Sequence, residues 1–260
     1  MKGKSDFLSV NQYILWQTDL SSKFPGRNPI KTLGAQLLVI EKPMKMLKVE
    51  FHCHTIFSKD SLTQPKTLVD AARRKEIDRL IVTDHNSIGG ALEAKNLDPE
   101  LVIVGEEVMT TQGELLAAFV TEEIPPGLEP PEAIRRLREQ GAFISVSHPF
   151  DGMRGWELPH LLEIIPLVDA IETFNARCLE ARTNQKAQDF AKEHHLPGTV
   201  GSDAHTAFEL GTATLLLPDF HDAQELRLAL QQAQQDTHLS PFWVHIASSY
   251  ATWYKKRKSP

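Results

Sequence analysis

The stretch LKVEFHCH, residues 47–54, alternates apolar and polar side chains and ends in two histidines. In a β-strand, side chains two residues apart lie on the same face. The apolar residues from Leu47 to Cys53 therefore share one face, and His52 and His54 share the other. The stretch predicts a strand that presents two imidazoles to a single site at its carboxyl end.

Four further apolar runs are each followed by residues that can bind a metal ion. The predicted strands are Leu80–Val82, Leu101–Val104, Phe143–Val146 and Gly198–Val200, and the motifs after them are Thr83-Asp84-His85, Gly105-Glu106-Glu107, Ser147-His148-Pro149 and Gly201-Ser202-Asp203-Ala204-His205. Taken singly, most of these motifs fit an ordinary structural residue. Ligand-type side chains at successive strand ends are, however, how a barrel of alternating strands and helices builds an active site. Together the motifs predict a metallohydrolase.

Helical patterns separate the strands, and the spacing predicts an α/β fold. Helices are expected from Pro65 and near Ala91–Lys95, Glu132–Gln140, Leu158–Ile165, Ala181–His195 and Ala223–Gln232, with further strands at Leu115–Val120, Ala170–Thr173 and Ala213–Leu217. Every crossover is long enough for a helix. We expect a closed or distorted (β/α)7 barrel of the TIM-barrel type. An open doubly wound sheet is disfavoured, because the sequence lacks the glycine-rich phosphate loops of the dinucleotide-binding and P-loop folds.

The sequence divides into three parts. Residues 1–45 are weakly periodic and form a predicted N-terminal extension, residues 46–245 form the catalytic barrel, and residues 246–260 form a basic C-terminal tail. The tail carries the run Lys255-Lys256-Arg257-Lys258, which we expect to be solvated.

Composition excludes several classes of protein. The chain has 260 residues, 28 Lys+Arg against 34 Asp+Glu and a net charge of -6, whereas a protein coated for non-specific nucleic-acid binding is usually basic. Its two cysteines, Cys53 and Cys178, do not make a disulfide framework, which favours a reducing cytoplasm. No stretch approaches the roughly 20 apolar residues of a membrane span. We therefore expect a cytoplasmic protein with no membrane span and no obligate protein partner.

The ordered set of motifs resembles the polymerase and histidinol phosphatase (PHP) family of metal-dependent phosphoesterases. The resemblance runs from about Met46 to about Leu217 and is carried by VEFHCHTIFSKDS, LIVTDHNSIGGALEA, VIVGEEVMTTQGELLA, ISVSHPF, DAIETFNAR and GSDAHTAFELGTA. It looks closest to the stand-alone branch that includes nucleoside-bisphosphate phosphatases and single-strand 5′-3′ exonucleases. The resemblance implies a distorted seven-stranded barrel and a site for two to three divalent metal ions. Imidazole and carboxylate ligands suit manganese, zinc or iron.

Carried over residue by residue, the resemblance implies a ligand set for each metal. The first metal would take His52, His54, Glu107 and Asp203; the second would share Glu107 and add His148; the third would take Asp60, His85 and His205. Relatives in this branch often have a histidine where this chain has Glu114, a harder and charged ligand for the second metal. Asp84 is expected to support a ligand rather than to bind. Glu107, Asp203 and His205 are the implied catalytic residues.

Three polar residues are expected to bind substrate. Arg177 and Asn175 belong to the family-like segment DAIETFNAR, and Arg154 follows the His148 motif. An arginine can bind a phosphate through two parallel hydrogen bonds. We expect Arg177 to take a phosphate at the mouth of the metal site.

The predicted activity is hydrolysis of phosphate esters, in nucleoside 3′,5′-bisphosphates or at the ends of short single-stranded nucleic acid. The implied metals would lower the pKa of a bridging water, so that hydroxide exists near neutral pH, and would neutralise phosphoryl charge. Two alternatives stay open: a phosphatase of another small metabolite, such as histidinol phosphate, and a non-catalytic metal-binding regulatory domain. An amidohydrolase is a more distant competitor, since no lysine ends a strand.

Overall fold

The computed structural model describes residues 45–258. The predicted extension, residues 1–45, lies outside this range except for its last residue. Among the described residues the strands form one nine-stranded sheet, with the order β7-β6-β5-β4-β3-β2-β1-β8-β9. The strands are β1 (Met46–Glu50), β2 (Arg79–Val82), β3 (Val102–Met109), β4 (Glu114–Ala118), β5 (Phe143–Val146), β6 (Ala170–Asn175), β7 (Gly198–Gly201), β8 (Ala213–Pro218) and β9 (Gln234–Thr237).

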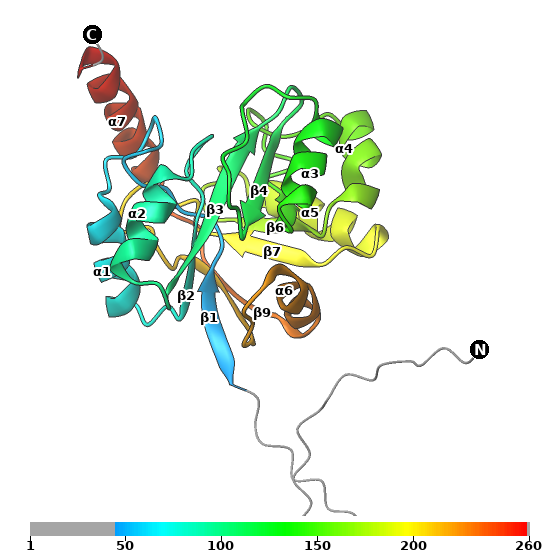
Figure 1. The fold of residues 1–260 in the computed structure, drawn as a ribbon. Coiled ribbons are helices and arrows are strands. Elements are labelled where there is room, and N and C mark those ends of the chain that lie inside the picture. The colour runs from blue at the N-terminus through cyan, green and yellow to red at the C-terminus, as the bar shows by residue number, and fades with distance from the viewer. Residues whose placement is uncertain (1–44, 259–260) are drawn as a thin grey trace, which may run out of the picture. The chain divides into compact units, whose positions relative to one another are not determined.

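The first seven strands form a nearly closed barrel (Figure 1). Strands β1, β2 and β3 run parallel, β5, β6 and β7 run parallel, and β4 is antiparallel to both of its neighbours. A parallel bridge between Cys53 and Ala204 joins the segments that follow β1 and β7. There the amide of His54 donates to the carbonyl of Ala204 at 2.8 Å. This bridge confirms the predicted distorted barrel, to which β8 and β9 are added beside β1.

Helices cover the outside of the barrel, and all of those described except α7 begin within two residues of the predicted start. They are α1 (Pro65–Arg74), α2 (Gly89–Leu97), α3 (Pro130–Glu139), α4 (Leu158–Ile164), α5 (Ala181–Glu193), α6 (Ala223–Ala229) and α7 (Val244–Lys258). Proline occupies the first turn of α1, α3 and α4, where its missing amide costs nothing. Gly141 follows α3 with φ +78°, as expected for the residue that ends a helix. Figure 1 shows α1 and α2 on one side of the barrel and α3, α4 and α5 on the other.

Three features differ from the sequence predictions. Strand β3 runs to Met109 rather than Val104, so Glu107 lies within the strand, and residues 110–113 join β3 directly to β4 as a hairpin. The prediction of a helix-length crossover is therefore wrong at this point. Strand β9 was not predicted, because its four residues are polar and mostly exposed. Residues 246–258 of the predicted tail lie in α7.

Both faces of the central strands are buried, as expected for parallel strands in a barrel. Leu80 and Val82 of β2 pack into one apolar cluster with α1 and α2, whereas Ile81 between them packs into a second cluster. The second cluster includes Phe51 and Phe143, whose rings meet edge to face at 6.2 Å. These clusters fix the strands whose carboxyl ends carry the polar site.

Candidate metal centre

The predicted ligands meet at the carboxyl end of the barrel. They come from the ends of β1 (His52 and His54), β2 (His85), β5 (His148) and β7 (Asp203 and His205), from within β3 (Glu107), from the start of β4 (Glu114) and from the loop after β1 (Asp60). All are buried except Asp60 and His85, which are partly exposed.

Glu107 lies at the centre of the cluster. Its Oε2 is 3.2 Å from Nε2 of His52 and 3.0 Å from Nδ1 of His85, and its Oε1 is 3.2 Å from Nε2 of His148. A carboxylate whose two oxygens face different imidazoles is placed to bridge two cations. Possible metal-binding groups around it are His52-His54-Glu107, His85-Glu107-Glu114 and His54-His85-His205, each with its ligand atoms within 4.8 Å of one another.

This grouping matches the implied ligand sets in part. Asp203 lies near the first set, with Oδ1 3.2 Å from Nε2 of His54, and His205 Nε2 is 3.2 Å from Oδ2 of Asp60 as the third set requires. His85 stands between the second and third sets: its Nε2 faces Asp60 at 3.5 Å, but its Nδ1 faces Glu107. Glu114 Oε2 lies 3.2 Å from Nε2 of His148, where it can join the second set.

The unsatisfied polar atoms of the cluster fit bound cations. Within residues 45–258, the buried side-chain atoms that have no hydrogen-bond partner include His52 Nε2, His85 Nδ1, Glu107 Oε2, His148 Nε2, His205 Nε2 and Asp60 Oδ1. A buried polar atom without a partner is costly, and native proteins leave few of them. So many orphaned ligand atoms facing one another are explained if divalent cations complete their coordination.

The electrostatics of the cluster keep its carboxylates charged. Burial alone would raise the pKa of Asp203, but Arg154 and His52 hold it well below its usual range. Burial and the neighbouring His205 and His85 lower the pKa of His54 to about 3. Metal binding requires carboxylates and neutral imidazoles, and His54 is in that form at neutral pH.

The pKa of His148 shifts in the opposite direction to that of His54. Burial and Arg154 act to lower its pKa, but the carboxylates of Glu107 and Glu114, each 3.2 Å from its Nε2, outweigh them and raise it to about 9. Without a cation, this imidazole is held as the counter-charge of two carboxylates. A cation binding there would have to displace its proton.

Glu172 supports the cluster and was missed in the sequence. Its Oε1 is 3.0 Å from Nδ1 of His52, and its Oε2 accepts from the amide of His148 at 2.8 Å. Such a partner fixes the orientation of a ligating imidazole. The available signal was a glutamate in the middle of the buried strand Ala170–Thr173.

Asp84 and Ser58 support His54 in the same way. Ser58 Oγ lies 3.1 Å from Nδ1 of His54 and donates to Asp84 Oδ1 at 2.6 Å. The other oxygen of Asp84 accepts from the hydroxyl of Thr55 at 2.6 Å. Both carboxylate oxygens thus accept hydrogen bonds from groups outside the cluster, and the supporting role of Asp84 stays a prediction.

The sequence predicts that Arg177 lies at the open mouth of the site, but the structure shows a buried side chain. Its Nη1 is 2.6 Å from Nδ1 of His205, and its Nη2 donates to the carbonyl of Val244 and the hydroxyl of Ser248 in α7. Its Nε is 3.2 Å from a carboxylate oxygen of Glu209. The guanidinium therefore links a predicted ligand to the C-terminal helix.

The other two predicted substrate residues differ in exposure. Asn175 is buried, and its amide donates to Glu172 at 3.1 Å and to Asp203 at 3.3 Å. Arg154 has a side chain that is 30% exposed, and its Nη1 is 2.9 Å from Oδ2 of Asp203. Of the three predicted substrate residues, Arg154 alone combines contact with the cluster and access to solvent.

Backbone geometry at the site is strained. His148 and Asp203 adopt φ values of +23° and +49°, in a region that non-glycine residues rarely enter. Gly201 is required beside them, because a Cβ there would lie 2.4 Å from Cβ of His52 and 2.5 Å from Oε1 of Glu172. Strain of this kind gathers at functional sites, where the surrounding structure maintains it.

A barrel with histidines and carboxylates at its strand ends can hold metal ions there. Models of two families match the chain: the PHP domain over residues 50–141 and the PHP-associated region over residues 181–234. The uncharacterized protein MJ0417 of Methanocaldococcus jannaschii is 37% identical over 172 residues, which cover 64% of this chain and 69% of the relative. The uncharacterized protein MJ1587 of the same organism is 34% identical over 149 residues, covering 50% and 82%.

Solved structures share the fold. A two-domain protein from Bacteroides vulgatus, described as containing a predicted PHP-like metal-dependent phosphoesterase, superposes with a TM-score of 0.63 at 20% identity, and the match covers 75% of this chain and 66% of that one. The lesion-specific endonuclease EndoQ of Pyrococcus furiosus gives a TM-score of 0.53 at 15% identity, covering 74% and 58%. The chain belongs to the PHP family.

Two further expectations concern the cysteines and the membrane. Cys53 and Cys178 are both free and buried. None of the helices within residues 45–258 combines the length and the apolar character needed to cross a membrane.

Proposed function

We propose that the protein hydrolyses phosphate esters of nucleotides, in nucleoside 3′,5′-bisphosphates or at the 5′ end of short single-stranded nucleic acid, with two to three bound Mn, Zn or Fe ions. The observation that carries the proposal is the set of buried, unpaired ligand atoms facing Glu107. The two free, buried cysteines support a cytoplasmic location.

Each residue of the cluster has a separate role in the proposed reaction. Divalent cations held by the cluster would supply charge neutralisation at the phosphoryl group and would lower the pKa of a water. Glu107 shares its two oxygens between neighbouring sites, and Asp203 stays ionised beside Arg154. Glu172 fixes the ring of His52 and leaves its Nε2 free to bind. Glu107, Asp203 and His205 are the proposed catalytic residues.

Arg154 is the proposed phosphate contact. It reaches the cluster through Asp203, and its Nη2 lies 3.6 Å from Asp151, yet its side chain is partly exposed and so accessible to a ligand. A guanidinium can hold two phosphoryl oxygens through charge-assisted hydrogen bonds. Arg177 is proposed instead to hold His205 against α7, and a direct contact with substrate stays a prediction for it.

A nucleotide or nucleic-acid substrate has support beyond the motifs. The P. furiosus neighbour with this fold is, by its name, an endonuclease. The net charge of -6 disfavours extended contact with nucleic acid, which leaves mononucleotides and short strand ends as the fitting substrates.

The test combines metal analysis with a substrate panel. Protein expressed with ample metal should retain two to three equivalents of transition metal by elemental analysis. It should hydrolyse a nucleoside 3′,5′-bisphosphate or a 5′-phosphorylated oligonucleotide faster than histidinol phosphate or p-nitrophenyl phosphate. Faster turnover of histidinol phosphate would favour the metabolite phosphatase, bound metal without turnover a regulatory domain, and no bound metal would overturn the proposal.

A further inference from the structure

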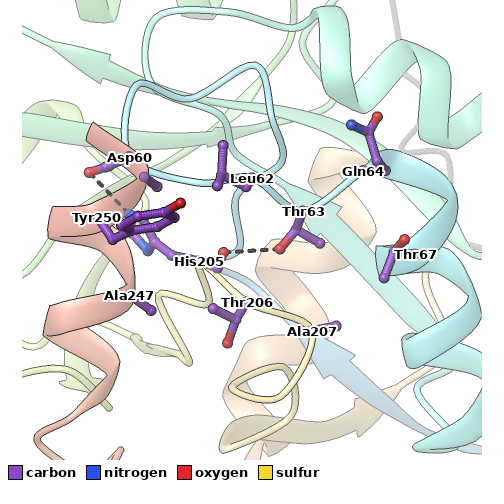
Figure 2. A pocket seen from close by; sticks show the side chains of 11 residues that line it. Asp60, Leu62, Thr63, Gln64, Thr67, His205, Thr206, Ala207, Ala247 and Tyr250 are labelled. Atoms are coloured by element: carbon purple, nitrogen blue, oxygen red, sulfur yellow. Dashed lines mark hydrogen bonds and ion pairs between the residues drawn. The ribbon is translucent and has the colours of Figure 1, made fainter. Parts of the chain in front are cut away.

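A pocket of about 360 Å³ lies directly beside the metal centre (Figure 2). Asp60 and His205, which belong to the ligand cluster, also line this pocket. Its other walls come from the loop before α1, from α1, from the segment after His205 and from α7. The volume falls in the range of small-molecule sites. A substrate whose phosphoryl group reached the cluster would therefore place its remaining part here.

The lining favours an uncharged part of the substrate. Among the described residues, neither lysine nor arginine lines the pocket, and Asp60 is its one carboxylate, so a second phosphate would not be stabilised there. Leu62 and Ala247 supply apolar surface. Within residues 45–258, the side chains of Gln64 and Thr67 make no hydrogen bond, so both are available to a ligand with polar edges.

Tyr250 of α7 supplies an aromatic wall. Its ring is half exposed, and Figure 2 shows it on the same side of the pocket as Asp60 and His205. Stacking on an aromatic side chain is a general way for proteins to bind a nucleobase, since every base has a π-face. Apolar walls, neutral polar groups and one ring together suit a flat heterocycle.

Helix α7 is held in place by contacts at both ends. Arg177 donates to the carbonyl of Val244 and to Ser248 in its first turns. Lys255, near its other end, donates to the carbonyls of Ile56 and Ser58 in the loop that carries Asp60. Figure 1 shows α7, in red, beside that loop. The helix is therefore a fixed wall of the pocket.

We propose that this pocket binds the base of the substrate, stacked on Tyr250, while the phosphate occupies the metal centre. The proposal rests on the proposed function, because it supposes a phosphate ester that carries a base. It assigns α7 a part in substrate recognition and makes Tyr250 a specificity residue.

The test compares two substrates that differ only in the base. Adenosine 3′,5′-bisphosphate and the base-free 1-deoxyribose 3,5-bisphosphate are offered to the metal-loaded full chain and to Tyr250→Ala, Tyr250→Phe and Phe242→Ala. Tyr250→Ala should lower the ratio of the two kcat/KM values about fivefold to a hundredfold, the range for loss of one stacked base. Tyr250→Phe keeps the ring and should preserve the ratio. Phe242→Ala removes an exposed aromatic outside the pocket and should also preserve it.

A second measurement separates the pocket from the activity. Saturation-transfer NMR with adenosine, which has no phosphate, should show contact with the wild-type chain and lose it in Tyr250→Ala. If both bisphosphates are hydrolysed and Tyr250→Ala leaves their ratio unchanged, the pocket assignment is overturned and the phosphoesterase proposal stands. If neither is hydrolysed, the proposed function fails, and the adenosine signal alone decides whether the pocket binds a base.

Discussion

The two ends of the ligand cluster differ in their access to solvent. At one end, His52, Glu107 and Asp203 are fully enclosed, and Nε2 of His52 lies 3.2 Å from Glu107 and 3.5 Å from Asp203. At the other end, the carboxylate of Asp60 is 21% exposed and faces the pocket beside α7. Electrostatic interactions are stronger where water is excluded. Under the proposed function, we expect bond cleavage at the enclosed end and recognition of the substrate at the open end.

This difference has a testable consequence. Substitutions at the enclosed end should slow the hydrolysis of every phosphate ester by the same factor, because all share the phosphoryl group. Substitutions at the open end should discriminate between substrates, because only some carry a group that reaches it.

Glu107→Gln should produce the largest effect. Loss of a residue that only supports a metal ligand costs about 10- to 100-fold in affinity or activity, and Glu107 itself faces two sites. We expect a loss of at least about a hundredfold in kcat on every substrate, together with less bound metal by elemental analysis and an unchanged circular dichroism spectrum.

The neighbouring residue provides the control. Glu106 is also a buried glutamate of β3, but its carboxylate accepts from the amide of Ile124 instead of facing the cluster. Glu106→Gln should retain its metal and its turnover. Near-normal kcat for Glu107→Gln at saturating manganese would show that the central role given to Glu107 is wrong.

Substitutions of Arg154 and Arg177 should have different effects, because only Arg154 is placed to contact the phosphate of a substrate. A charge-assisted hydrogen bond to phosphate is worth roughly 1.5–3 kcal/mol, about tenfold to a hundredfold in binding. Arg154→Ala should therefore lower kcat/KM by that factor, and by more for a nucleoside 3′,5′-bisphosphate than for p-nitrophenyl phosphate. Arg177→Ala should lower both equally and should also reduce the free energy of unfolding, because it releases His205 and α7 together.

Steady-state kinetics on both substrates will measure the loss of kcat/KM in each variant. Denaturant titration of both variants will measure the change in the free energy of unfolding. A selective loss on the bisphosphate in Arg177→Ala, with unchanged stability, would restore the direct phosphate contact that the sequence suggests. It would mean that the guanidinium leaves His205 when substrate binds.

The sequence predicted the enclosed end well. The residues there follow apolar strands, and parallel strands of one barrel bring their carboxyl ends together whatever the helices between them do. Strand pattern and ligand chemistry were therefore sufficient to bring His52, Glu107 and Asp203 to one place. The extension of β3 was missed, since Gly105 and two glutamates interrupt its apolar pattern although Glu107 pairs with Leu116 of β4.

The open end depends on contacts that a local pattern cannot show. Residues 246–258 have the composition of a solvated basic tail, yet Lys255 and Ser248 contact residues that lie far from them in the sequence. Arg177 was assigned from its position after a strand. Its actual partners include Ser248, which is 71 residues away. Tertiary partners of this kind decide whether an arginine is available to substrate.

Glu106 and Glu107 are both fully buried in β3, but different groups surround their carboxyls. Imidazoles hold the pKa of Glu107 well below its usual range, although burial alone would raise it. Burial raises the pKa of Glu106 from 4.5 to about 8, and the nearby Glu123 adds to the effect. Neighbouring charges, rather than enclosure, thus distinguish the carboxylate that faces the ligand cluster from the one that does not.

The raised pKa of Glu106 predicts a loss of stability in alkali. In the folded chain this carboxyl stays protonated up to about pH 8, whereas in the unfolded chain it ionises near 4.5. The folded state therefore binds the extra proton between these values, and the free energy of unfolding falls as the pH rises through this window. Glu106→Gln cannot ionise and should escape that fall. Urea titrations should find the variant roughly 1–3 kcal/mol more stable than the wild type at pH 9, and close to it at pH 5. An equal decline in both proteins would show that the carboxyl of Glu106 ionises in the folded chain well below pH 8. Burial would then raise its pKa less than its surroundings indicate.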